Sequence, residues 1–135
     1  MKIYVVTGQR GADIVEMANK LKAKYQCKMI KFPETKPYHS YDLCDYMLGI
    51  VHGCYENNEN LVVVTYSEVV LDSVRLWVAR NKFTGAECIN VLSNNDEIVN
   101  VEIDENGEME QWVRGVFDIK RIVLKELLYI RRSRK

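Results

Sequence analysis

Residues 61–67 read Leu-Val-Val-Val-Thr-Tyr-Ser, and this stretch decides the fold. An unbroken apolar run of this length is typical of a strand covered on both faces, such as the central strand of a parallel α/β sheet. Apolar residues recur at helical spacing from Glu68 to Arg80, which predicts a helix that Ser67 can cap. Because ligands of open α/β sheets bind beyond the carboxyl ends of the strands, Thr65, Tyr66 and Ser67 stand where chemistry is expected.

The chain before this stretch has the same alternation of short apolar runs and longer amphipathic ones. Strands are predicted at Lys2–Val6 and Lys28–Phe32, and helices at Gly11–Tyr25 and at about His39–Cys54. Strands that alternate with helices indicate a parallel sheet with right-handed crossovers.

The second half of the chain has a different pattern. Ala86–Leu92 and Glu97–Ile103 are predicted strands separated by a turn signal, and Glu108–Trp112 is a candidate third strand. Together they predict an antiparallel meander attached to the sheet. A closing helix is expected at about Val116–Ile130. Its apolar residues are Ile119, Ile122, Val123, Leu127 and Ile130. The predicted fold class is therefore α/β, with a mostly parallel sheet between layers of helices, a meander and a closing helix.

Length, composition and charge limit the function classes. A chain of 135 residues, 47% hydrophobic and 28% charged, is typical of one globular domain. We assign residues 1–130 to a single α/β domain and 131–135 to a basic tail. The formal net charge is zero, and the tail carries four positive charges at Arg131, Arg132, Arg134 and Lys135, which leaves about −4 on the body. A body of that sign does not attract nucleic acid. The tail is either a solvated helix end or a contact for phosphates.

Cysteine and histidine spacing argues against a metal site. Cys27, Cys44, Cys54 and Cys88 contain no Cys-x-x-Cys pair, and His39 and His52 lie 13 residues apart. Reduced thiols in a cytoplasmic protein are the expectation. No apolar segment reaches the ~20 residues of a membrane span, so no membrane partner is expected. We expect no metal and no cofactor.

The turn between the first strand and the first helix contains Gly8 and Gly11. It has the position of a phosphate-binding P-loop but lacks that loop's lysine and hydroxyl residue. Gly8 and Gly11 could still present backbone donors to an anion, with Arg10 adding charge. The alternative is a plain strand-to-helix turn.

Glu34 follows the second strand at its carboxyl end. A carboxylate there can orient water or hold magnesium, as in nucleotide hydrolases; the alternative is a solvated loop glutamate. Lys31 occupies the place of the natural metal partner, and a lysine opposes a divalent cation.

Several segments resemble, in the same order, parts of one family. Val64-Thr65-Tyr66-Ser67-Glu68 is similar to a strand end that reads Glu-Thr-His-Ser. Residues 30–34 and 36–39 resemble a Walker B strand ending in Glu-Asn-Pro-Glu and a loop bearing His-Pro. Residues 101–107 and 112–118 resemble a closing Asp-x-x-Gly turn and a Trp-Pro-x-Gly-Phe-Phe-Asp segment, and residues 8–12 a Gly-x-x-Gly-Glu segment. The family is the ABC-class ATPases of the AAA type, near the overcoming-lysogenization-defect and SMC-like branch.

The resemblance covers the C-terminal lobe of that family and implies half of a P-loop NTPase fold without the Walker A lobe. By this comparison Lys31 replaces the metal-side carboxylate, Tyr66 replaces the switch histidine, and Glu34 matches the catalytic glutamate. Lys31, Glu34, Tyr66 and Ser67 would then be vestigial nucleotide-site positions. Phosphoryl transfer depends on positioned metal and cationic groups, so no hydrolysis is expected.

Three functions follow as hypotheses. The first is a non-catalytic protein-interaction or regulatory module that binds an intact ATPase or a second copy of itself. The second is a small nucleotide- or anion-binding protein or enzyme in which Gly8, Arg10, Glu34 and Tyr66 share one pocket. The third is association with nucleic acid through the basic tail.

Overall fold

The computed structural model describes residues 1–9, 11–31, 40–94, 97–113, 116 and 119–134. Five strands and four helices are present within these ranges. In chain order they are β1 (Ile3–Gly8), α1 (Ile14–Tyr25), β2 (Cys27–Lys31), α2 (Ser40–Glu56), β3 (Asn60–Val64), α3 (Glu68–Asn81), β4 (Ala86–Val91), β5 (Ile98–Ile103) and α4 (Ile119–Ser133). The alternation predicted for the first half is confirmed, with shifts of at most three residues at the element ends.

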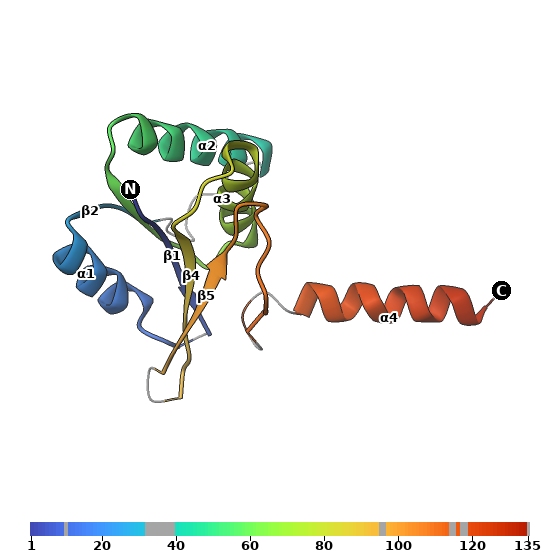
Figure 1. Ribbon diagram of the computed structural model, residues 1–135. Helices are drawn as coiled ribbons and strands as arrows, with labels where there is room; N and C mark the ends of the chain where they lie inside the picture. Colours follow the sequence, from blue (N-terminus) through green and yellow to red (C-terminus); the bar gives the residue numbers. More distant parts are fainter. Residues whose placement is uncertain (10, 32–39, 95–96, 114–115, 117–118, 135) are drawn as a thin grey trace.

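The strands form one mixed sheet in the order β2-β3-β1-β4-β5 (Figure 1). The first four strands in this order are parallel, and β5 pairs antiparallel with β4. The prediction that residues 61–67 form the central strand is wrong in position, because β1 lies in the middle, between β3 and β4. The strand also ends at Val64, so Thr65, Tyr66 and Ser67 belong to the connection that follows it.

Helices cover both faces of the sheet, and each face has its own apolar core. On one face, Ile14, Ala18 and Leu21 of α1 pack with apolar side chains of β1, β3 and β4. On the other face, α2 and α3 pack against the alternate residues of the same strands. The predicted start of α1 at Gly11 is wrong, because Asp13 caps the helix by accepting a hydrogen bond from the amide of Glu16 at 3.0 Å.

The predicted third strand of the meander is wrong. Within residues 97–113, Met109 makes only an isolated bridge to Ile103 beyond β5. The segment instead follows α3, where Arg75 Nε donates to the carbonyl of Gly107 at 2.7 Å. The Arg75 guanidinium also lies over the ring of Trp112, 5.0 Å from its centroid. These contacts hold the chain against a helix, so it cannot lie along the sheet edge.

The last helix does not close the fold. Helix α4 projects away from the sheet and the other helices (Figure 1), and every side chain from Val123 to Arg134 is exposed. It extends to Ser133, so Arg131 and Arg132 of the predicted tail lie inside the helix. The helices that the structure describes include none long and apolar enough to cross a membrane.

Candidate functional site

The candidate site lies at the carboxyl ends of β1 and β3. These neighbouring parallel strands send their following helices, α1 and α3, to opposite faces of the sheet. Such a point, where the connections diverge, is where open α/β sheets form a ligand-binding crevice. Gly8 at the end of β1, Gly11 in the turn after it, and Tyr66 and Ser67 in the turn after β3 therefore stand at the position where such a crevice is expected.

Tyr66 spans this crevice. Its hydroxyl donates a hydrogen bond to the carbonyl oxygen of Ala12, 3.2 Å away, in the turn after β1. The two turns are also joined at their base, since the Thr65 amide donates to the Val6 carbonyl at 3.0 Å. Tyr66 remains 39% exposed, so its ring lies partly at the surface, where the two turns meet.

Thr65 and Ser67 have structural roles in the turn after β3. Thr65 is buried, and its hydroxyl oxygen accepts a hydrogen bond from the Ser67 amide at 2.9 Å. Ser67 occupies the N-cap position of α3, yet its side chain makes no capping hydrogen bond. The prediction that Ser67 caps the helix is therefore correct in position and wrong in chemistry. The Thr65 side chain closes this turn.

Close packing requires a glycine at position 8. A Cβ atom at Gly8 would lie 2.5 Å from the carbonyl oxygen of Val91 and 2.8 Å from Cγ2 of Ile14, so only glycine allows β4 and α1 to approach this closely. Gly11 differs, because it has a φ of +93° and a Cβ there would meet nothing within 4 Å. Gly11 thus serves the turn's left-handed conformation and faces open space. Arg10 lies outside the described residues.

The backbone donors of this turn are partly engaged within the protein. The amide of Gln9 donates to the Val91 carbonyl at 2.9 Å, and the amide of Ala12 donates to the Gln9 carbonyl at 3.0 Å. The Gln9 side-chain oxygen accepts from the amide and the hydroxyl of Ser93, at 2.9 and 3.1 Å. A phosphate-binding turn directs its amides toward the ligand, whereas these two amides bind protein carbonyls.

Lys31 and Glu34 were predicted beside the crevice. Lys31 is the exposed last residue of β2 and lies level with Val64 of β3, one residue before Thr65. It therefore comes from the strand next to the one that leads to Tyr66. Glu34 and His39 lie outside the described residues. The described structure thus brings Gly8, Gly11, Tyr66 and Ser67 around one crevice, with Lys31 one strand away.

Thr7 is a feature of this region that the sequence analysis missed. It is fully buried at the end of β1, and its hydroxyl is the one buried side-chain polar atom without a hydrogen-bond partner in the described part of the chain. No local pattern marks it, since a threonine near the end of a strand is ordinary.

A second region lies where α2 packs on α3. Trp77 is buried in the core, and its indole N–H donates to Nδ1 of His52 at 3.4 Å. Nε2 of His52 lies 3.1 Å from a carboxylate oxygen of Glu56. His52 is thus a half-exposed surface residue that packs on a core tryptophan.

Within the described ranges, no three His, Cys, Asp or Glu side chains gather closely enough to hold a metal ion. The four cysteines are free, and burial raises the pKa of the Cys27, Cys54 and Cys88 thiols. A raised pKa keeps a thiol protonated and unreactive, so these three are core residues.

Comparison of the chain with protein-family models, with curated proteins and with solved structures finds no match. Any function must therefore be argued from the geometry of the site and the resemblance of the short motifs.

Proposed function

We propose that this chain is a non-catalytic relative of an ABC-class ATPase lobe that works as a protein-interaction or regulatory module. The observation that carries the proposal is the hydrogen bond from the Tyr66 hydroxyl to the Ala12 carbonyl, which spans the crevice where a sheet of this kind binds its ligand. A side chain fixed across that crevice competes with any nucleotide for the same space.

The arrangement of the strands is compatible with such an origin. A parallel set of four strands, helices on both faces and a crevice beside β1 are what half of a P-loop NTPase fold requires. The ATPase-like layout in its detail, with the Walker A lobe lost, is part of this proposal.

The chemistry at the crevice also supports a loss of catalysis. Lys31 at the end of β2 adds positive charge where a metal-dependent hydrolase needs a carboxylate. Tyr66 offers a hydroxyl that is engaged with Ala12, where an imidazole is expected from the family. A lobe that no longer hydrolyses nucleotide can retain the surfaces through which such lobes associate. We expect the protein to be cytoplasmic.

The test is a paired assay of turnover and binding. We expect no ATP hydrolysis with magnesium above the rate without protein, and no rise in melting temperature with saturating nucleotide. Tyr66→His restores the family residue and removes the bond to Ala12, while Tyr66→Phe removes only the bond. Turnover by the unmodified chain that Glu34→Gln abolishes would refute the proposal.

A second candidate function, binding of a small anion or nucleotide, is favoured by Thr7. A buried hydroxyl without a partner destabilises the protein unless something satisfies it. If a ligand does so, phosphate or a nucleotide should raise the melting temperature of the unmodified chain, and Thr7→Val should abolish the rise. A rise that Thr7→Val leaves unchanged would exclude this role for Thr7.

Nucleic-acid association through Arg131, Arg132, Arg134 and Lys135 stays a prediction. It requires salt-sensitive binding that is lost when residues 131–135 are deleted.

A further inference from the structure

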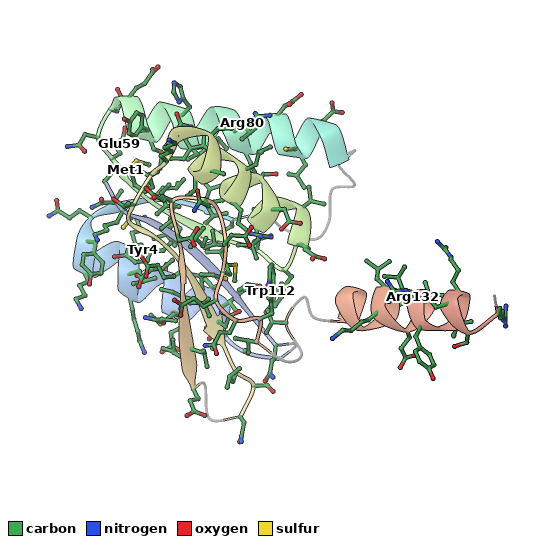
Figure 2. The ribbon with its side chains drawn as sticks, turned by 45° about the vertical axis from the view of Figure 1, so that its right-hand side comes forward. Met1, Tyr4, Glu59, Arg80, Trp112 and Arg132 are labelled. Carbon is green, nitrogen blue, oxygen red and sulfur yellow. The ribbon has the colours of Figure 1, made fainter. Side chains whose placement is uncertain are left out.

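Helix α4 presents an apolar stripe to solvent. Six large hydrophobic side chains between Val123 and Ile130 are between 43% and 74% exposed. Five of them share one side of the helix and form the stripe, namely Val123, Leu124, Leu127, Leu128 and Ile130, and Tyr129 lies on the other side. Figure 2 shows the side chains of α4, Arg132 among them, standing clear of the rest of the protein. A lone helix of 15 residues is marginal in water, so a partner must cover this stripe for α4 to be stable.

A groove without such cover lies on the α1 side of the sheet. It has a volume of about 220 Å³, and Tyr4, Leu21 and Ile89 contribute to its apolar surface. Helix α1 forms one wall, and Asn100 marks the other side on the edge strand β5. Beyond Asn100, Ile98 is 43% exposed. Ile89 and Val91 of β4 are already buried on this side. Because a sheet needs a layer on each face, the part that still lacks one is the face of β5 that carries Ile98, Asn100 and Glu102.

Two carboxylates face each other on this surface. Glu87 of β4 lines the groove and lies directly opposite Glu102 of β5 in the antiparallel ladder. Like charges at such a position destabilise a sheet. Neither carboxylate forms an ion pair within the described residues, and the two lysines of α1 that line the same groove make other contacts. Lys20 binds Glu16, and Lys24 lies over the ring of Tyr25. The pair indicates a cationic partner for this face.

We propose that α4 packs into this groove on a second copy of the chain, forming a two-fold dimer by exchange of C-terminal helices. The apolar stripe would cover Ile98 and the exposed face of β5, and the basic residues beside the stripe would approach Glu87 and Glu102. The proposal rests on the proposed function, since it names a second copy as the partner of the interaction module.

The charge distribution favours packing of α4 on the body of a second copy over pairing of two α4 helices. Residues 119–135 contain seven basic residues and one acidic residue, a net charge of +6, so residues 1–118 carry −6. Two α4 helices would repel each other, whereas α4 of one copy and the body of the other attract.

The path of the chain favours a second copy over the same copy. The segment before α4 is held on the opposite side of the sheet from the groove, where Arg75 binds Gly107 and covers Trp112. From there α4 points away from its own body (Figure 1). Each copy has a projecting helix and an open groove. Two copies can therefore each place α4 in the groove of the other.

The first experiment is sedimentation velocity of the full chain over a concentration series, with charge-reversed variants. Arg131 lies one helical turn after Leu127, in line with the apolar stripe, so Arg131→Glu should weaken the dimer about tenfold, and so should Glu102→Lys. The two variants combined should recover most of the affinity. Lys125→Glu is the matched control, with the same charge change on the side of the helix away from the stripe, and it should weaken the dimer less. A chain that stays monomeric at every concentration overturns the proposal.

The second experiment locates the helix by disulfide formation in a Cys44→Ser background. Ile98→Cys and Leu127→Cys chains are mixed, and a covalent dimer of the two is the expected product. A chain carrying both substitutions that closes its disulfide within one copy overturns the exchange. Binding of phosphatidylserine vesicles or duplex DNA by a chain that stays monomeric also overturns it, since the stripe then serves another surface. These outcomes leave the proposed function intact, because ATP turnover tests that function separately.

Discussion

Gly107→Ala tests the contact that holds the segment after β5 against α3. Gly107 has a φ of +76°, and a Cβ atom there would lie 2.5 Å from the carbonyl oxygen of Arg75 and 3.3 Å from Cβ of Ala79. The carbonyl oxygen of Gly107 itself accepts the 2.7 Å hydrogen bond from Arg75 Nε. The substitution therefore pushes the turn away from the helix at the point where it is bound.

Two terms set the size of the effect. A side chain in the left-handed region costs about 1 kcal/mol. Moving the turn also breaks a hydrogen bond from a charged donor, which contributes about 1.5 to 3 kcal/mol. We therefore expect Gly107→Ala to lower the free energy of unfolding by about 3 kcal/mol or more, a large part of the ~5–15 kcal/mol that stabilises a typical domain.

Gly11→Ala is the matched control. Gly11 has a similar φ of +93°, but its Cβ would meet nothing within 4 Å, so only the backbone term of about 1 kcal/mol applies. Urea unfolding of the three proteins measures the difference as a shift in midpoint at constant slope. Equal losses for the two variants would refute the reasoning, because they would mean that the contact between Gly107 and Arg75 adds nothing.

Three further predictions follow from local contacts. Asp13→Ala should lower the free energy of unfolding by about 1 kcal/mol, because it removes a side-chain cap, whereas Ser67→Ala should change it little, since Ser67 makes none; urea unfolding compares them. Burial raises the pKa of the Cys88 thiol from 9.0 to about 12. The unfolded chain therefore loses the thiol proton at a lower pH than the folded chain does. Stability should therefore fall as the pH rises from 9.0 toward 12, and Cys88→Ala should flatten that slope in melting curves. In native protein, maleimide should label Cys44 far faster than the buried Cys88, and unfolding should abolish the difference; equal native rates would contradict the placement of Cys88.

The sequence was sufficient where a pattern is local. The apolar run at residues 61–64 predicted β3, because a strand buried on both faces is apolar at every position. The helical spacing after Glu68 predicted α3, because a helix buried along one stripe has apolar residues three or four positions apart.

The sequence was insufficient where distant residues decide. Gly8 could be taken for an anion site or a plain turn, and the choice depends on Val91, which β4 brings beside it. The third strand predicted at Glu108–Trp112 failed because Arg75, more than 30 residues earlier, binds this segment to α3. The prediction that the Ser67 side chain caps α3 is wrong, because the hydrogen bond in this turn runs from the Ser67 amide to the Thr65 hydroxyl.

The region around Tyr66 and the last helix differ in whether their side chains have partners within the chain. At the crevice, Tyr66 binds Ala12 and Gln9 binds Ser93, so side chains from separate turns have become partners of one another. On α4 and on the face of β4 and β5, the apolar stripe and the Glu87–Glu102 pair have no such partners among the described residues. Groups already joined to each other oppose ligand binding, whereas complementary groups left open on one chain favour association. These contacts favour the exposed side of β5, together with α4, as the binding surface of this protein over the region between the ends of β1 and β3.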